Sequence, residues 1–348
     1  GNDTYRYYSD AGDMRISIWG EPDGFGSDRF IFEDLNLADV TFSTAPATLT
    51  ADGIYLVATF TDGNNDTHTV EFANKGGKIN WFEFADGSVF DRVLIEPNHH
   101  PSETEHQILG TSGDDLIISP EGDTSYYLKG QDGDDTLIVQ NDASGVGLLA
   151  GRNGDDTYIY YKSAGDVRIS EWGEGAGMGD DTLRFADLNL RDVSFSIVDT
   201  GSYAGSLEIA FSDGSEHSIY IDKGGAYINR FEFADGSTFK YVRFDDEEDC
   251  VKLVGSGGDD LIYSPTSTDH RYYLQGMEGN DTLVADTDAP GRSFMAGREG
   301  NDTYRYYAEA GDMRVSIWGE PDGFGWDRFI FEDLNLADVT FSTAPATL

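Results

Sequence analysis

Aspartates at a fixed spacing from glycines are the residues of this 348-residue chain that could do chemistry. A frame of the form G-x-x-G-[DN]-D-x-apolar recurs, as in "GQDGDDTLI" from Gly130 and "GMEGNDTLV" from Gly276. Glycine permits tight turns that point carbonyl oxygens inward, and the aspartate at position six adds a carboxylate. Hard oxygen ligands of this kind suit Ca²⁺. His and Cys are absent from these loops, which disfavours zinc and copper.

The frame resembles the nonapeptide G-G-x-G-x-D-x-U-x of the RTX, or haemolysin-type, calcium-binding repeats. Copies begin at residues 110, 130, 151 and 176 and again at 255, 276, 297 and 322, with further pieces near the N-terminus. The second glycine of the family survives only at Gly24, Gly177 and Gly323, so its backbone role is open in the other loops. We therefore expect an all-β fold, a parallel β-roll or β-solenoid of such nonapeptides.

The resemblance implies that each calcium ion lies between two loops stacked one turn apart. Neighbouring copies are 20 to 25 residues apart. This spacing fits a full turn made of one half-turn with the calcium-binding frame and one half-turn whose loop lacks it. We therefore expect ions on mainly one side of the roll. Counting the gaps between neighbouring loops predicts roughly seven ions. The implied side-chain ligands are Asp3, Asp28, Asp115, Asp135, Asp156, Asp181, Asp260, Asp281, Asp302 and Asp327, with backbone carbonyls around Gly113, Gly133, Gly154, Gly179, Gly258, Gly279, Gly300 and Gly325.

The alternative is a set of Gly/Asp-rich β-turns without metal. In such a stack every turn would add an aspartate to a column with nothing to neutralise the charge. We therefore favour calcium.

Longer repeats divide the chain into modules. Residues 1–49 and 300–348 differ at only four positions, and a weaker copy starts at Gly154. This predicts a partial module over 1–104, a complete module over 105–250 (β-roll 107–185, β segment 186–250) and a second partial module over 251–348. Both ends fall at the same repeat phase, so we expect these residues to be a window on a longer, self-associating array.

The second half of each module predicts half-buried strands. "LEIAFSDG", "HSIYID" and "INRFEFADG" between residues 207 and 236 alternate apolar and polar positions and end in turn signals. This part resembles the haemolysin-type calcium-binding-related segment that follows RTX repeats, and we expect it to continue the solenoid or cap it with antiparallel strands. "DGNNDTHTVEF" from Asp62 starts like an EF-hand loop but lacks its glycine and glutamate, which predicts a hairpin turn instead.

Composition excludes several classes of function. A net charge of −42 excludes nucleic acid as a partner and argues against binding to anionic membranes. No apolar window is long enough to span a membrane, and the single cysteine, Cys250, allows no internal disulfide. Neither G-x-S-x-G nor H-E-x-x-H occurs and the six histidines are scattered, so we expect no enzyme activity.

Together with the resemblance, these features predict an extracellular calcium-binding structural protein. The family implies bacterial type I secretion, with folding driven by calcium outside the cell. We expect self-association into a surface fibre, filament or adhesin stalk. An accessory region of a larger secreted enzyme or toxin remains the alternative.

Overall fold

A computed structural model shows that the chain is all-β, with parallel sheets arranged as a β-solenoid of about 12 turns. This confirms the predicted fold class. The chain packs as two compact units, one of residues 1–187, 198–208 and 216–229 and the other of residues 188–197, 209–215 and 230–348. The structure describes residues 2–16, 28–46, 54–73, 79–97, 104–119, 125–140, 145–170, 179–212, 217–226, 228–245, 250–266, 270–316 and 325–343.

Two four-stranded sheets precede the first stack of loops. One consists, in order, of β1 (Thr4–Tyr7), β3 (Asp28–Phe32), β7 (Ile79–Glu83) and β8 (Val89–Phe90). The other consists of β2 (Met14–Ile16), β6 (Thr67–Phe72), β5 (Ile54–Thr61) and β4 (Thr41–Pro46). Strands β4, β5 and β6 form an antiparallel meander, whereas β2 pairs in parallel with β6. Aromatic pairs such as Phe30–Phe72 and Phe32–Phe84, with ring centroids 4.9 and 4.7 Å apart, fill the core.

The predicted hairpin turn at Asp62 is confirmed. It joins the antiparallel strands β5 and β6, and Asp62 Oδ1 accepts hydrogen bonds of 2.9 Å from the backbone N–H groups of Asn64 and Asp66. These bonds close the turn on itself, as an aspartate commonly does.

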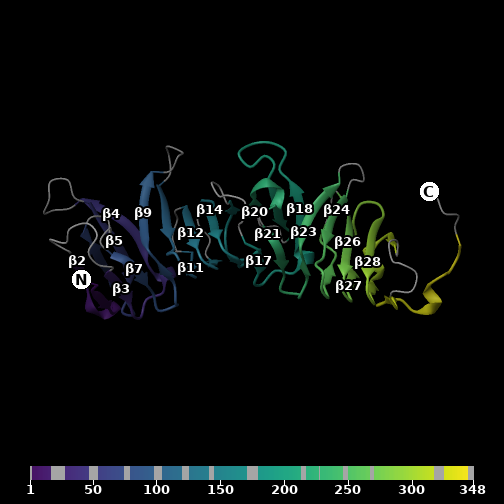
Figure 1. The fold of residues 1–348 in the computed structure, drawn as a ribbon, viewed down its shortest axis with the longest axis horizontal. Helices are drawn as coiled ribbons and strands as arrows, with labels where there is room; N and C mark the ends of the chain where they lie inside the picture. Colours follow the sequence, from purple (N-terminus) through teal and green to yellow (C-terminus); the bar gives the residue numbers. More distant parts are fainter. Residues whose placement is uncertain are drawn as a thin grey trace. The chain divides into compact units, whose positions relative to one another are not determined.

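The first stack has two walls of mainly parallel strands (Figure 1). Position eight of each frame faces the core, as expected: Ile117, Leu137 and Tyr158 are at most 1% exposed. One wall contains β9 (Arg92–Pro97), β10 (Thr104–Leu109), β12 (Tyr126–Asp132), β14 (Gly147–Asn153), β16 (Val167–Ile169) and β20 (Ser218–Ile221), of which only β9 runs antiparallel to its neighbour. The other contains β11 (Leu116–Ile118), β13 (Thr136–Val139), β15 (Thr157–Tyr160) and β17 (Asp181–Phe185).

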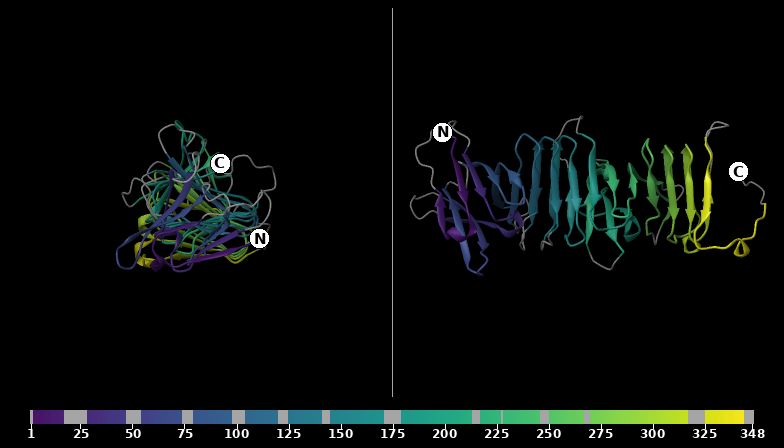
Figure 2. Two further views of the ribbon diagram at one scale, coloured as in Figure 1. Left: turned by 90° about the vertical axis from the view of Figure 1, so that its left-hand side faces the viewer. Right: turned by 90° about the horizontal axis from the view of Figure 1, so that it is seen from below.

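The second stack repeats this arrangement, and Figure 2 shows its strands running side by side. Cys250 is buried at the start of this stack. One wall contains β23 (Tyr241–Asp245), β24 (Cys250–Val254), β26 (Arg271–Glu278), β28 (Ser293–Glu299) and β30 (Met313–Val315), of which β23 is antiparallel. The other contains β25 (Leu261–Tyr263), β27 (Thr282–Ala285), β29 (Thr303–Tyr306) and β31 (Arg328–Phe331).

The segment after the first stack both continues the solenoid and adds antiparallel pairing. Strand β20 pairs in parallel with β16, whereas β21 and β22 pair antiparallel. The "KGG" turn signal forms a short 3₁₀ helix rather than a tight turn. The remaining strands are β18 (Val193–Ile197), β19 (Leu207–Phe211), β21 (Ile228–Glu232) and β22 (Thr238–Phe239), and the 3₁₀ helices are η1 (Ser9–Ala11), η2 (Leu37–Asp39), η4 (Leu190–Asp192), η5 (Asp222–Gly225), η6 (Ala308–Ala310) and η7 (Leu336–Asp338).

Among the described residues, every helix is too short to cross a membrane. The predicted module limits near residues 104 and 250 stay predictions.

Candidate metal-binding loops

The position-six aspartates form columns along the stacks. In each gap between neighbouring loops, a carboxylate Oδ1 accepts a hydrogen bond of 2.8–3.1 Å from the backbone N–H of the aspartate one turn earlier. This bond fixes one oxygen of every acceptor carboxylate and sets the spacing of the column. The donor and acceptor pairs are Asp3–Asp28, Asp115–Asp135, Asp135–Asp156, Asp156–Asp181, Asp260–Asp281, Asp281–Asp302 and Asp302–Asp327.

Most of these carboxylates are buried, although Asp3 and Asp327 are exposed. Burial, together with the neighbouring carboxylates of the column, raises the pKa of Asp135 to about 8 and that of Asp281 to about 7. Desolvation also raises the pKa of Asp115 and Asp302. In the absence of a cation, the interior of each column therefore favours protonated carboxyl groups.

In several column aspartates the second carboxylate oxygen, Oδ2, has no hydrogen-bond donor among the described residues. The Oδ2 atoms of Asp135, Asp281 and Asp302 are buried and accept no hydrogen bond from any described residue. A buried oxygen of this kind is destabilising unless a donor or a cation satisfies it. Each column therefore contains oxygens with an unused capacity to bind a cation.

Backbone carbonyls converge on the same oxygens. A Cβ atom added at Gly130, the first residue of its loop, would lie 1.9 Å from Asp135 Oδ2 and 2.7 Å from the carbonyl oxygen of Gly151. At Gly276 in the second stack the corresponding distances are 2.0 Å to Asp281 Oδ2 and 2.7 Å to the Gly297 carbonyl oxygen. Only glycine fits here, and the oxygens around it are all acceptors. The sequence did not predict this role for position one.

The predicted carbonyls at position four also lie between loops. A Cβ atom added at Gly154 would lie 2.0 Å from the Gly133 oxygen, and one at Gly279 would lie 2.5 Å from the Gly258 oxygen. Similar contacts involve the carbonyls of Gly113, Gly154 and Gly279, whereas none of those contacts involves the carbonyls of Gly179, Gly300 and Gly325. The structure thus brings five of the eight predicted carbonyls against the next loop.

Position two has a positive φ in several loops although the residue there is not glycine. Gln131, Arg152, Met277 and Arg298 have φ values of 100°, 84°, 92° and 83°. Side chains in this region cost about 1–2 kcal/mol each, so the surrounding ladder must impose the conformation. The surviving second glycines, Gly24, Gly177 and Gly323, lie outside the described residues.

A second ladder, at position five, was missed by the sequence analysis. Here the donor and acceptor are reversed: the N–H of Asp134 donates to Asp114 Oδ1 at 2.9 Å, and the N–H of Asn280 donates to Asp259 Oδ1 at 2.7 Å. The bonds continue from Asp155 to Asp134, from Asp180 to Asp155, from Asn301 to Asn280 and from Trp326 to Asn301. The recurrent Asp or Asn at position five was the available signal.

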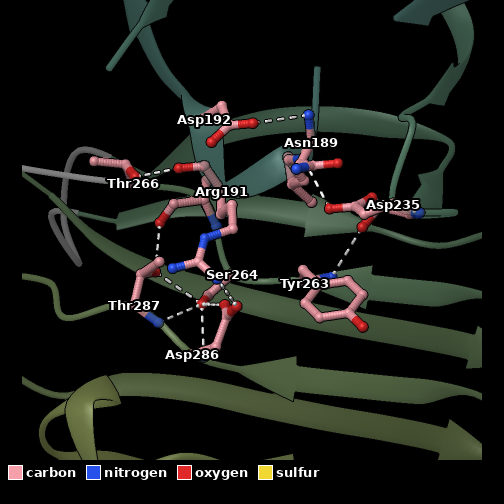
Figure 3. A network of polar contacts seen from close by, with 12 residues as sticks. Asn189, Arg191, Asp192, Asp235, Tyr263, Ser264, Thr266, Asp286 and Thr287 are labelled. Atoms are coloured by element: carbon pink, nitrogen blue, oxygen red, sulfur yellow. Dashed lines mark hydrogen bonds and ion pairs between the residues drawn. The ribbon is translucent and has the colours of Figure 1, made fainter. Parts of the chain in front are cut away.

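A different polar network lies within the second unit (Figure 3). Arg191 of η4 points toward Asp286, with Nη1 and Oδ2 3.4 Å apart, and the buried Ser264 hydroxyl donates to Asp286 Oδ1 at 2.9 Å. Thr287 donates to Ser264 through its backbone N–H at 3.0 Å and its hydroxyl at 2.8 Å, and the Thr266 hydroxyl donates to the Arg191 carbonyl. Because its members satisfy one another, this network holds η4 on the second stack.

The donor set of the columns fits calcium. Among the described residues, no three His, Cys, Asp or Glu side chains are grouped around one possible metal position. A cation in a column would therefore be bound by one or two carboxylates and several backbone carbonyls. Ca²⁺ accepts such mixed sets of oxygen ligands in flexible geometry.

No protein-family description matches the chain, and no curated protein matches its sequence.

Proposed function

We propose that this chain is a calcium-binding structural protein that folds when it meets calcium outside the cell. The observation that supports the proposal best is the set of buried Oδ2 atoms at Asp135, Asp281 and Asp302, which accept no hydrogen bond from the described part of the chain and lie in columns of stacked carboxylates. Ca²⁺ would bind to these oxygens and to the adjacent glycine carbonyl oxygens, and its positive charge would neutralise the carboxylates.

Folding and binding are coupled in this proposal because the site is made of two successive turns. Without a cation, the ionised carboxylates of neighbouring turns repel one another and favour an extended chain. Binding that requires stacked loops adds its free energy to folding. Extracellular calcium modules have dissociation constants of about 10⁻⁴–10⁻³ M, so the chain would fold outside a cell and stay unfolded inside one. The proposal is therefore that the protein acts outside the cell or on its surface, and the resemblance to RTX repeats adds bacterial secretion to it.

Self-association into a fibre, filament or adhesin stalk is the second part of the proposal. Its support is the long repeat in the sequence, because residues 1–49 and 300–348 differ at only four positions. Each stack also repeats the same parallel pairing of strands from one turn to the next.

Circular dichroism and light scattering with and without a chelator test both parts. At pH 9, where the column carboxyl groups are ionised, we expect the strand signal to disappear on chelation and to return with calcium but not with an equal concentration of magnesium. Strand signal that is unchanged by the chelator would contradict the calcium proposal. Scattering that does not increase with calcium would contradict self-association alone.

Variants make this test specific to the columns. Asp281→Asn keeps the shape of a buried ligand but removes its charge, and it should raise the calcium concentration needed for folding. Asp62→Asn removes one charge from the β5–β6 hairpin and serves as the matched control, for which we expect no change.

A further inference from the structure

The first loop of each stack differs from the inner loops in how its aspartate is satisfied. In the first stack, the Thr111 backbone N–H donates to Asp115 Oδ2 at 2.5 Å, and the Thr111 hydroxyl approaches the same atom at 3.1 Å. In the second stack, the N–H and hydroxyl of Ser256 donate to Asp260 Oδ2 at 2.6 and 2.9 Å. The same closure thus occurs twice, once at the start of each stack.

The hydroxyl also closes the loop on its other side. Thr111 Oγ1 accepts a hydrogen bond from the N–H of Gly113 at 3.2 Å, and Ser256 Oγ accepts one from the N–H of Gly258 at 3.1 Å. Each first loop is therefore bound internally from its second residue to its sixth.

The inner loops lack this closure. Their second residues include Gln131, Met277 and Arg298, which have positive φ values, whereas neither Thr111 nor Ser256 does. In the same three loops the aspartate Oδ2 accepts no hydrogen bond from a described residue. The second residue of the frame thus distinguishes a loop whose carboxylate is satisfied from one whose carboxylate is open.

We propose that Thr111 and Ser256 are capping residues that take the place of a calcium ion in the first gap of each stack. This inference rests on the proposed calcium binding. An N–H group aimed at Oδ2 places its partial positive charge where a cation would bind, so the two compete for that oxygen. Each stack of three gaps would then hold two ions, and the seven ions predicted from the loop spacing would become five.

The caps also give each stack an end that is ordered without metal. A first loop has a stacked aspartate loop on one side only, so only one neighbouring loop can hold it in its turn conformation. Internal hydrogen bonds take the place of the missing neighbour and leave a preformed turn on which the next loop can stack. Calcium would therefore be needed to add turns to a stack and not to form its first turn.

Counting bound ions tests the inference. Native mass spectrometry and equilibrium dialysis should be applied to the whole chain in saturating calcium, for the unchanged protein and for Thr111→Gly, Ser256→Gly and the double variant. Glycine can adopt the open conformation of the inner loops, so each single variant should bind one more ion and the double variant two more.

Two control variants separate the cap from general effects of substitution. Ser112→Gly changes the next, exposed residue and should leave the count unchanged. Thr111→Val removes the hydroxyl but keeps the N–H that occupies Asp115 Oδ2, and it should also leave the count unchanged. Because Thr111 and Ser256 lie in different stacks, a variant that fails to fold in one stack leaves the other as a test.

The outcomes are distinguishable. Additional ions in both glycine variants support the inference. Calcium binding with the same count in all variants overturns the inference and leaves the proposed function intact. A chain that binds no calcium in any variant overturns the proposed function and the caps with it.

Discussion

The stack from Gly110 and the stack from Gly255 share one backbone plan but differ in charge. Both have an unbroken column of aspartates at position six, linked by the same hydrogen bonds. At position five, however, the first stack has aspartate in every loop, whereas the second has only one. The position-five residues are Asp114, Asp134, Asp155 and Asp180 in the first stack and Asp259, Asn280, Asn301 and Trp326 in the second.

This comparison separates the two roles of the loop residues. Asparagine keeps the acceptor oxygen that receives the next N–H, as Asn280 Oδ1 does from Asn301 at 3.0 Å. The position-five ladder therefore needs an acceptor but not a charge. Position six is aspartate in all loops of both stacks, and in the proposed function only that column needs the charge itself.

The largest expected effect is the dependence of the calcium-free protein on pH. The pKa of Asp135 is raised to about 8 and that of Asp281 to about 7 in the folded state, above the ordinary value. Protonated carboxyl groups therefore stabilise the calcium-free fold. This stability is fully present below about pH 4 and is lost as the pH rises through about 7 in the second stack and about 8 in the first.

Circular dichroism of protein freed of calcium by dialysis measures this effect. The strand signal should be present at pH 5 and largely absent at pH 9. Asp135→Asn should retain the signal to higher pH than the unchanged protein, and Asp281→Asn should do so to a smaller extent. Asp62→Asn is the control, because hydrogen bonds in its turn lower the pKa of Asp62 and place its titration below this range. A signal that increases with pH would contradict the burial of these carboxyl groups.

The next effect concerns the glycines that the two stacks share. A Cβ atom at Gly151 would lie 2.0 Å from Asp156 Oδ2, and one at Gly297 would lie 1.8 Å from Asp302 Oδ2. Alanine at either position should therefore destabilise the protein by about 3 kcal/mol, as overpacking does. Urea unfolding in saturating calcium measures the loss, which should be similar in the two stacks.

Two other loop glycines provide matched controls. Among the described residues, a Cβ atom at Gly113 has no neighbour within 4 Å, and one at Gly258 has its nearest neighbour at 3.8 Å. Alanine at these positions should change the free energy of unfolding by less than about 0.5 kcal/mol. Equal losses at the crowded and open glycines would show that the loops do not pack as described.

The columns could be predicted because their repeat period can be read directly from the order of residues along the chain. A fixed spacing of position-six aspartates, with an apolar residue two positions later, determines which residues stack and which face the core. Ile117, Leu137 and Tyr158 lie inside as that spacing requires. The hairpin at Asp62 was predictable for the same reason, since its turn signal lies within a few residues.

What the sequence could not predict depends on contacts between turns. The convergence of Asp135 Oδ2 with the Gly151 carbonyl joins two loops and requires the side-chain orientation to be known. The positive φ of Gln131 and Met277 contradicts their local preference and is imposed by the stacked strands. Thr111 and Ser256 carried a readable signal, because a hydroxyl occupies position two only in the first loops of the two stacks, but its meaning required the hydrogen bonds.

The smallest expected effect is on the position-five charge that distinguishes the stacks. Asp134→Asn keeps an acceptor for the N–H of Asp155 but removes one negative charge, and Asn280→Asp adds one at the equivalent place in the second stack. One exposed charge near a cation site is worth up to about 1 kcal/mol, or roughly a fivefold change in affinity. Asp134→Asn should therefore weaken calcium binding and Asn280→Asp should strengthen it.

Calcium titration followed by calorimetry at low and high salt measures this difference. The effect should shrink in high salt, because exposed charges are screened, whereas the effect of Asp281→Asn should persist because Asp281 is buried. Asp62→Asn changes the net charge by the same amount as Asp134→Asn but lies in the β5–β6 hairpin, so it separates local from overall charge. If Asp134→Asn and Asp62→Asn weaken binding equally, position five has no special influence, and the two stacks differ only in their total charge.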